Sequence, residues 1–373
     1  MNVRLNDFRR QWALVGSEVL AVAEKVGQSG HYVLGPKVEA LERTLAKSWP
    51  TAAAVGVGSG LDALEIGLRC LGVSAGDRVL TTPLSAFATT LAILRVGATP
   101  VFVDVDRSGL LDLGLCRVFL ESRRDVRCLL PVHLYGHALD LDELERLGAD
   151  FGMEILEDCA QSIAATWGER STGAVGRIAA TSFYPTKNLG ALGDGGAVLT
   201  SSASLAERAR ALRHYGQSAT YVHDHVGLNS RLDELHAAIL AEVFLPRLPG
   251  WTASRRRIAA RYRKEIANSA IEMPPVAESS HSCWHLFPIL VAPERRSALV
   301  GHLRGCGIDT GAHYPRLIPE QRALAEYGRF EVVGDLVQAR RFADGEVSLP
   351  VHPLLTEEEI AHVIASCNEW RSG

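Results

Sequence analysis

The chain lacks the features that would place it in a membrane, in a secretory pathway or on nucleic acid. No stretch of its 373 residues approaches the roughly 20 uninterrupted apolar residues of a membrane span. The N-terminal segment MNVRLNDFRRQW is polar and carries no apolar signal-peptide core. Because 39 basic residues stand against 43 acidic ones, for a net charge of -4, there is no basic excess for nucleic acid. We therefore expect neither a membrane nor a nucleic-acid partner.

Patterned cysteines and low-complexity segments are missing as well. The seven cysteines are scattered singly, with no CxxC pair, which predicts reduced thiols, a cytoplasmic location and no metal site. Hydrophobic residues make up 47% of the chain and charged residues 22%, as is usual for a globular protein. A chain of this length is expected to form one large domain and a smaller one.

From about residue 50 onward, short apolar runs alternate with helical patterns. Near-continuous apolar strands that alternate with helices predict an α/β fold with a mostly parallel sheet covered on both faces. Seven runs predict a seven-stranded sheet, at residues 52–57, 78–83, 99–105, 127–133, 153–159, 179–185 and 196–201. Helices are expected between and after these runs, at 61–71, 85–96, 140–151, 205–212 and 232–244.

A small α+β domain is expected at the C-terminal end of the chain. Pro249 and Gly250 should break the helical pattern, which divides the chain into a large domain, 1–250, and a small one, 251–373. The small domain is predicted to contain helices at 255–267, 294–305 and 356–367 and a strand at 285–291. The run Arg255–Arg257 is interpreted as a solvent-facing side of the first of these helices, with the alternative that one of the three arginines meets a diphosphate.

The first of three motifs in the large domain is GVGSGLDALE (56–65), in which small residues join a strand to a helix. The N–H groups and the positive end of a helix that starts at Ser59 and Gly60 suit a phosphate. The spacing is not GxGxxG, and glycines are also common in ordinary strand–helix turns. This motif alone leaves both interpretations open.

The second motif, ILEDCAQS (155–162), places Glu157 and Asp158 at the end of an apolar strand. Ligands of open α/β sheets bind outside the carboxyl ends of strands, and a carboxylate there could hold the protonated nitrogen of a pyridine ring. Helix N-capping after the strand is the ordinary alternative for such a carboxylate.

The third motif, TSFYPTKNLGALGDGGAV (181–198), places Lys187 in a glycine-dense turn between two strands. Such a rigid setting favours a Schiff-base lysine, whose amine must be partly desolvated to lose its proton. Ser182, five residues earlier, could donate to a phosphate oxygen. Taken alone, the segment also fits a surface lysine in a glycine-rich hairpin.

The order of the three motifs favours the chemical interpretation of each. A glycine turn, then a strand-end aspartate, then a lysine 29 residues later is the order used by fold-type-I enzymes that depend on pyridoxal phosphate. Lys187 and Asp158 are therefore the predicted catalytic residues, and pyridoxal phosphate is the predicted cofactor.

The chain also resembles the DegT/DnrJ/StrS-type sugar aminotransferases, from NDF (6–8) to SLPVHPLLTEEEI (348–360). The motifs that carry the resemblance are GSGLDALE, GATPVFVDVD (97–106), HLYGHALDLDEL (133–144), EDCAQS, SFYPTKNLGALGDGGAV and GLNSRLDELHAAIL (227–240). The resemblance implies a fold-type-I pyridoxal-phosphate transferase that forms a homodimer with shared active sites.

Roles for individual cofactor contacts follow from the resemblance. Lys187 would carry the cofactor as a Schiff base, Asp158 would pair with the pyridine nitrogen, and Gln161 would bind the ring hydroxyl. Ser182 and the backbone at Ser59–Gly60 would hold the phosphate.

Further contacts are implied at the subunit boundary and in the substrate pocket. Asn229 would reach the cofactor phosphate of the neighbouring subunit. Leu61 stands where the family usually has threonine, and Ala86 stands where it commonly has an aromatic residue, so Phe87, the next residue, is the candidate to stack on the cofactor ring. The candidate substrate-binding residues are Tyr221, His223, Arg231, His313 and Tyr314.

The resemblance implies an aminotransferase that moves an amino group from glutamate or glutamine to a nucleotide-linked keto sugar in amino-sugar biosynthesis. The motif GLNSRLDE, with Tyr221 and His223 before it, is more similar to relatives that aminate C3 than to those that aminate C4. Amination of a keto-cyclitol is the close alternative. Sugar dehydratases of this fold carry histidine in place of Lys187, and a non-catalytic regulator would not need the set Asp158, Ser182 and Lys187.

Overall fold

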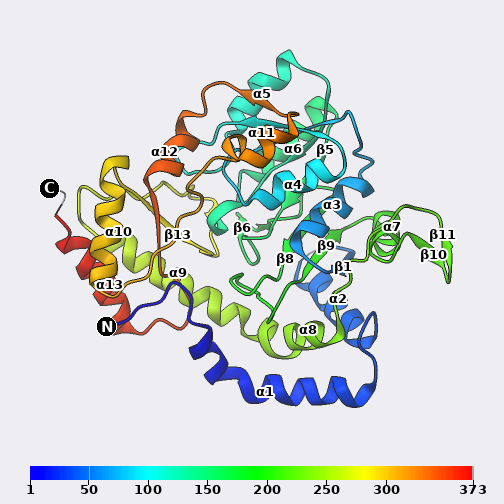
Figure 1. Cartoon of the computed structure of the whole chain (residues 1–373), viewed down its shortest axis with the longest axis horizontal. Helices are drawn as coiled ribbons and strands as arrows, with labels where there is room; N and C mark the ends of the chain where they lie inside the picture. The colour runs from blue at the N-terminus through cyan, green and yellow to red at the C-terminus, as the bar shows by residue number, and fades with distance from the viewer. Residues whose placement is uncertain (50, 372–373) are drawn as a thin grey trace.

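The structure, a computed structural model, describes residues 1–49 and 51–371. An eight-stranded sheet occupies its centre (Figure 1). The strand order is β1 (Ala53–Val57), β9 (Gly196–Thr200), β8 (Ile178–Ser182), β5 (Glu154–Asp158), β4 (Val126–Leu130), β2 (Arg78–Thr81), β3 (Thr99–Val103) and β14 (Glu331–Val333). Neighbouring strands are parallel except where β9 pairs with β1 and β8. The predicted α/β fold with a mostly parallel sheet is thus confirmed.

Each of the seven predicted strands is present, and the sheet contains one more. β14 pairs in parallel with β3, with Val332 opposite Phe102. The prediction of seven strands was wrong by one, because a three-residue strand with partly exposed side chains shows no apolar run. Although β14 lies beyond residue 251, it joins the large sheet, and Leu317, Leu336 and Phe342 belong to the same core. The division of the chain at residue 250 stays a prediction.

Helices cover both faces of the sheet, and the sheet separates two apolar cores. The helices of this part of the chain are α1 (Phe8–Ser29), α2 (Pro36–Ser48), α3 (Gly60–Cys70), α4 (Phe87–Arg95), α5 (Leu113–Ser122), α6 (Leu141–Phe151), α7 (Ala203–Arg213) and α8 (Glu234–Ile239). Side chains of a strand alternate between its faces, so in β8 Ile178 and Ala180 enter one core and Ala179 enters the other. α3 and α7 contribute to the first core, and α1, α2 and α8 contribute to the second.

The chain leaves the large sheet through a continuous helical segment. α8 is followed directly by η2 (Leu240–Phe244), η3 (Leu245–Arg247) and α9 (Leu248–Glu265). Pro249 and Gly250 fall in the first turn of α9, where the missing N–H of a proline would have had no partner within the helix. The predicted helix break at these two residues is therefore wrong.

A third core lies in the C-terminal part, on the left of Figure 1 near both termini. β13 (Phe287–Leu290) pairs antiparallel with β15 (Glu346–Leu349). α9, α10 (Arg296–Gly305), α13 (Glu357–Glu369) and the N-terminal Val3 pack around this pair. Over the described residues, no helix combines the length and the hydropathy that crossing a membrane requires.

The remaining elements are short. They are η1 (Leu134–Gly136), β6 (Thr166–Trp167), β7 (Arg170–Ser171), β10 (Gln217–Ala219), β11 (Val222–His223), β12 (Ser280–His281), η4 (Pro293–Arg295), η5 (Ile318–Glu320), α11 (Arg322–Tyr327) and α12 (Val337–Gly345). The β10–β11 hairpin projects from the body of the molecule at the right of Figure 1.

Candidate active site

Four predicted residues meet at one edge of the sheet, where β1, β5 and β8 end. Ser59–Gly60 follows β1, Asp158 is the last residue of β5, and Ser182 is the last residue of β8. These strands run in the same direction, so their carboxyl ends share the edge at which open α/β sheets bind ligands. A Cβ at Gly60 would lie 2.6 Å from the Cβ of Ser182. The two motifs can approach this closely only because residue 60 is glycine.

This edge offers the donors that a phosphate needs. The Ser59 hydroxyl caps α3 by accepting the N–H of Asp62 at 3.1 Å, and the first N–H groups of a helix lie at its positively polarised end. The Ser182 hydroxyl accepts the N–H of Tyr184 at 3.2 Å, which leaves its own proton available for donation. Ser59, Gly60 and Ser182 thus fit a phosphate group, as their predicted role requires.

Asp158 is a buried carboxylate held by two neighbours. One oxygen accepts the N–H of Ala160 at 3.0 Å, and the other accepts the hydroxyl of Thr89 at 2.9 Å. Burial raises the pKa of Asp158, while these two hydrogen bonds and the charge of Lys187 oppose the rise. A protonated ring nitrogen beside this carboxylate would pair with its buried charge.

Lys187 lies in the loop that joins β8 to β9. Its N–H donates to the carbonyl oxygen of Tyr184 at 2.8 Å and so closes a turn. A Cβ at Gly190 would collide with the carbonyl group of Pro185, which is why the loop needs glycine at that position. Burial lowers the pKa of Lys187 to about 8, although the nearby carboxylate of Asp158 opposes this shift. Such an amine is partly neutral at physiological pH and can act as a nucleophile.

The rate at which the apo-protein attaches pyridoxal phosphate should rise with pH and reach half its maximum near pH 8. Lys187 must be neutral to attack a carbonyl carbon, and its lowered pKa places half of the amine in that form at about pH 8 instead of 10.5. Stopped-flow absorbance across a pH series measures the rate. A free lysine derivative, measured alongside, corrects for titration of the cofactor itself. A midpoint close to 10.5 would contradict the desolvation of Lys187.

The neighbouring Glu157 has a structural role. One of its oxygens contacts Nε2 of His133 at 2.9 Å, and both oxygens accept N–H groups of the loop 173–176 at 2.7 to 2.8 Å. Burial alone would raise the pKa of Glu157, but the His133 contact and the N–H groups lower it overall. His133, Glu157 and Cys159 have ligand atoms within 4.8 Å of one another. Because hydrogen bonds already occupy both carboxylate oxygens, this cluster anchors the loop.

Two predicted substrate-binding residues lie beside the predicted cofactor contacts. The amide of Gln161 accepts the N–H of Tyr135 at 2.8 Å and donates to the hydroxyl of Tyr314 at 3.1 Å. The hydroxyl of Tyr135 donates to the carbonyl oxygen of His313 at 2.6 Å. The structure therefore brings His313 and Tyr314 together with Gln161, whose contact with the ring hydroxyl stays a prediction.

The side chain of His313 is oriented by Ser348 and Glu346. The hydroxyl of Ser348 contacts Glu346 and lies 2.8 Å from Nδ1 of His313. Burial raises the pKa of Glu346 to about 8, so this carboxyl can hold a proton at neutral pH, and the protons of the three groups are shared along the chain Glu346–Ser348–His313. Burial lowers the pKa of His313 to about 4, and the charge of Lys187 adds to this shift. A neutral His313 can thus form a hydrogen bond with a substrate hydroxyl through Nε2.

Phe87 does not join this group. It packs against Phe102, Ile318 and Leu324, whereas Thr89, about 200° further around α4, contacts Asp158. Phe87 thus points in a different direction from Thr89, and its stacking on the cofactor ring stays a prediction.

The remaining predicted contacts lie on or near the projecting hairpin. Tyr221 is 87% exposed, and Nδ1 of His223 contacts the carbonyl oxygen of Tyr215 at 2.9 Å. The guanidinium of Arg231 lies 5.4 Å from the ring centroid of Tyr215. Asn229 is exposed. Within one chain the hairpin lies away from the loop between β8 and β9 (Figure 1), so Tyr221 and His223 are not brought together with Lys187.

Sequence reasoning missed the residues that surround Lys187 on the side of the C-terminal core. A small cavity beside Lys187 is lined by the segment Asn6–Phe8, by His352 and by Arg255. Arg255 is only 5% exposed, so the interpretation of Arg255–Arg257 as a solvent-facing side is wrong for its first residue. The spacing of Arg255 from Ile258 and Tyr262, three and seven residues along one helix face, was the signal for burial.

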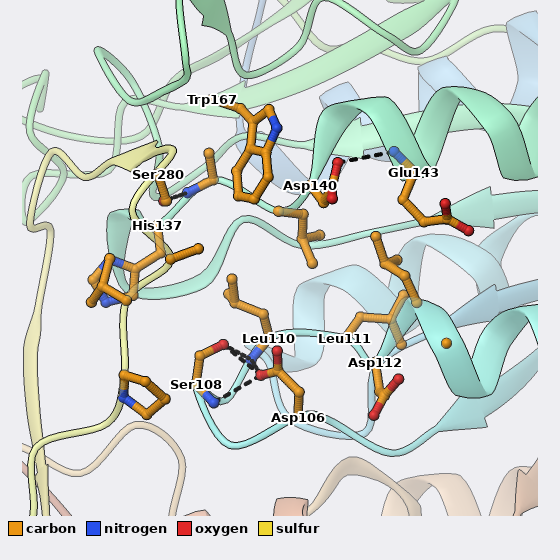
Figure 2. A pocket seen from close by; sticks show the side chains of 17 residues that line it. Asp106, Ser108, Leu110, Leu111, Asp112, His137, Asp140, Glu143, Trp167 and Ser280 are labelled. Atoms are coloured by element: carbon orange, nitrogen blue, oxygen red, sulfur yellow. Dashed lines mark hydrogen bonds between the residues drawn. The ribbon is translucent and has the colours of Figure 1, made fainter.

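A pocket of about 410 Å³ lies apart from these residues (Figure 2). It is formed by the loop after β3, the segment 137–143, Trp167, the loop 275–277 and Ser280. Its acidic groups are already engaged: Asp106 accepts the N–H of Ser108 at 2.8 Å, and Asp140 accepts the N–H of Glu143 at 3.0 Å. No predicted catalytic or cofactor-binding residue lines this pocket.

Comparison with known proteins identifies the family. A sequence model of the DegT/DnrJ/EryC1/StrS aminotransferase family matches residues 14–368. The chain belongs to this family. The match covers Asp158, Ser182 and Lys187 at the sheet edge, and it confirms the predicted resemblance.

Three curated relatives span almost the whole chain of this family member. The dTDP-3-amino-3,4,6-trideoxy-alpha-D-glucose transaminase of Streptomyces venezuelae is 41% identical over 98% of this chain and 95% of its own. The erythromycin biosynthesis sensory transduction protein EryC1 of Saccharopolyspora erythraea is 41% identical over 98% and 99%. The UDP-N-acetyl-3-dehydro-alpha-D-glucosamine 3-aminotransferase of Acidithiobacillus ferrooxidans is 36% identical over 96% and 95%.

Solved structures of family members share the fold. DesV from S. venezuelae, in complex with a ketimine intermediate, superposes with a TM-score of 0.93 at 40% identity, over 99% of this chain and 98% of its own. NtdA from Bacillus subtilis, with bound pyridoxamine phosphate, gives a TM-score of 0.85 at 28% identity, over 94% and 80%. These findings confirm the prediction of a pyridoxal-phosphate-dependent aminotransferase.

Proposed function

We propose that this aminotransferase moves an amino group from glutamate or glutamine to a keto sugar carried by a nucleotide, at C3 of the sugar. The observation that carries the proposal is the meeting of Asp158, Ser182 and Lys187 at one sheet edge, in a chain whose relatives include enzymes named for 3-amino sugars. Its place would be amino-sugar biosynthesis in the cytoplasm, where its seven free cysteines would stay reduced.

Each residue at the sheet edge would have a separate role in the reaction. Pyridoxal phosphate, when bound, supplies a ring that draws electrons from the reacting carbon. Lys187 would hold the cofactor and later carry a proton on Nζ between the reacting carbon of the substrate and the cofactor. Asp158 would keep the ring nitrogen protonated, Ser59–Gly60 and Ser182 would hold the phosphate, and Nε2 of His313 would form a hydrogen bond with a sugar hydroxyl.

A substrate panel tests the proposal. Purified holoenzyme is loaded with amino groups from L-glutamate or L-glutamine and then given dTDP- and UDP-linked 3-keto sugars, their 4-keto isomers and a keto-inositol. We expect amine formation with a 3-keto nucleotide sugar and little with the others. Exclusive reaction with the keto-inositol would replace the proposal by the cyclitol alternative, and reaction with the 4-keto isomers alone would move the position to C4.

A regulatory function is the second candidate, because one relative is named as a sensory transduction protein. The intact set of Asp158, Ser182 and Lys187 argues against it, since a regulator needs no nucleophilic amine. Holoenzyme that binds pyridoxal phosphate but transfers no amino group from any amino acid would favour the regulatory candidate.

We further propose that the enzyme is a homodimer with shared active sites. Apolar side chains near Lys187 and on the hairpin are exposed in the single chain, namely Tyr184, Leu192, Tyr221, Val222 and Val226. A second copy that covered them would hide apolar surface and, in a two-fold dimer, would complete two equal sites. Asn229 precedes Ser230, whose hydroxyl accepts the N–H of Gly58 at 2.9 Å. Asn229 thus lies near the start of α3 of its own chain. Its predicted contact with the cofactor phosphate of the partner therefore needs a direct test.

Mixing Lys187→Ala protomers with Asn229→Ala protomers should restore activity. If Asn229 serves the partner's site, each mixed dimer has one site with both defects and one intact site. A one-to-one mixture at exchange equilibrium should then reach about a quarter of wild-type activity, because about half of the dimers are mixed. Native mass spectrometry verifies exchange. No recovery despite exchange, with Asn229→Ala itself impaired, would place Asn229 in the site of its own chain.

A further inference from the structure

Arg255 is a buried cation without a carboxylate partner in the described part of the chain. Its side chain is 5% exposed, and its hydrogen bonds all run from Nη1 to the carbonyl oxygens of Trp284, His285 and Val351, at 3.2 to 3.4 Å. Within residues 1–49 and 51–371, no hydrogen bond reaches Nε or Nη2, and neither nitrogen is sealed from accessible space. Buried charges are normally paired, so an unpaired one beside a cavity points to an anionic ligand.

The free edge of the Arg255 guanidinium is complementary in shape to a carboxylate. Nε and Nη2 lie on one side of the planar guanidinium and can donate to both oxygens of one carboxylate at once. Burial lowers the pKa of Arg255 to about 10, and the side chain therefore stays charged at neutral pH. A planar, charged fork of this kind is better suited to a carboxylate than a lysine would be.

Arg255 lines two adjoining cavities. The first also contains Lys187, and the second, of about 150 Å³, lies between Arg255, His285 and His313. Thr186 and Asn6 line both. Burial, together with the charges of Lys187 and Arg255, keeps the pKa of His285 well below its usual range. The unpaired guanidinium thus belongs to a residue that lines one cavity together with Lys187 and an adjoining one together with His313.

We propose that Arg255 binds the α-carboxylate of the amino-acid donor, an inference that rests on the proposed aminotransferase function. In an α-amino acid the carboxylate is attached to the carbon that bears the amine, so its binding site must share a cavity with Lys187. The diphosphate of a nucleotide sugar is attached at C1, two carbons from the proposed position of amination.

The test separates the two half-reactions and adds a binding measurement. Glutarate keeps both carboxylates of glutamate but has no amine, so calorimetry with wild-type holoenzyme reports carboxylate binding alone. We expect Arg255→Gln to weaken glutarate binding by about tenfold or more. The loading half-reaction with L-glutamate should need a correspondingly higher glutamate concentration. The half-reaction of the preloaded enzyme with the keto sugar should stay within about twofold of wild type, which also shows that the variant is folded.

Arg256→Gln is the matched control, because Nε and Nη2 of Arg256 already donate to carbonyl oxygens at 2.8 to 3.2 Å. It should change neither glutarate binding nor either half-reaction. Loss of only the sugar half-reaction in Arg255→Gln would assign Arg255 to the diphosphate and overturn the proposal. Unchanged binding and loading in Arg255→Gln would overturn it too.

A crystal structure of wild-type holoenzyme with glutarate decides the question even if Arg255→Gln does not fold. One carboxylate should lie within hydrogen-bond distance of Nε and Nη2 of Arg255, and a carboxylate bound elsewhere in the site would overturn the proposal. If wild-type holoenzyme reacts with no amino acid at all, the proposed function fails. If it reacts and Arg255 makes no contribution, only this inference fails.

Discussion

Lys187→Ala should abolish turnover and leave the chain folded. The loss should be on the order of ten-thousand-fold or more, because one side chain would supply both the nucleophile and the proton carrier. The fold should survive, since the turn at Lys187 is closed by its backbone N–H on the carbonyl oxygen of Tyr184, which alanine retains. Burial already disfavours the protonated amine, so its removal should not lower the melting temperature.

Borohydride reduction provides a second readout for Lys187→Ala. Reduction fixes the cofactor on the lysine to which it is attached, and peptide mass spectrometry then locates that lysine. Wild-type protein should carry the label on Lys187, and the variant should carry none. Lys264→Ala is the control, because Lys264 is exposed on α9 and should leave both activity and labelling unchanged. Ordinary turnover or labelling in Lys187→Ala would remove Lys187 from the mechanism.

The sequence predicted the parts of the site in which a backbone conformation requires particular residues. Gly60 and Gly190 stand where a side chain would collide with Ser182 or with the backbone of Pro185, so the glycine pattern itself marked the phosphate edge and the Lys187 loop. The strand that ends at Asp158 was equally visible, since a buried parallel strand is an almost unbroken apolar run.

Residues that reach the site through tertiary packing gave weaker signals. Thr89 binds Asp158 from the first turn of α4, but a threonine in a helical pattern does not indicate which neighbour it will meet. Arg255 comes to Lys187 because α9 runs from the large sheet to the C-terminal core. The charge of Arg255 suggested a solvent-exposed side chain, and only its spacing from buried apolar residues suggested burial. β14 was missed for a related reason, since its pairing with β3 is decided by distant packing.

Phe87 shows how little a resemblance says about the direction of a side chain. It lies one position from the place where the family commonly has an aromatic residue, and one residue along a helix changes the direction of a side chain by about 100°. Phe87 consequently fills the cluster of Phe102, Ile318 and Leu324. Position along a motif is therefore a poor guide to contact when the motif begins a helix.

Asp158→Asn should keep the cofactor bound and lose most of the activity. Asparagine has nearly the same volume. Its Oδ1 can accept the N–H of Ala160, and its Nδ2 can donate to the hydroxyl of Thr89, which can turn its own proton toward Ser85, so the surrounding contacts should persist. A neutral amide cannot hold a proton on the ring nitrogen, and the ring then draws electrons poorly. We expect kcat to fall at least about a hundredfold, which corresponds to about 2.7 kcal/mol in the barrier.

The neighbouring carboxylate serves as the comparison for Asp158→Asn, because Glu157 is equally buried but anchors the loop 173–176. Glu157→Gln should lower the melting temperature, since an amide NH2 would face an N–H donor of that loop, and it should affect kcat much less. Asp158→Asn should show the opposite pattern, with a near-normal melting temperature and a low kcat.

Absorbance of the bound cofactor, titrated with pH, adds a direct readout: the ring nitrogen should lose its proton at a lower pH in Asp158→Asn than in wild type. Near-wild-type kcat in Asp158→Asn would show that another residue holds the ring nitrogen, and a collapse in stability would show that Asp158 acts chiefly through the fold.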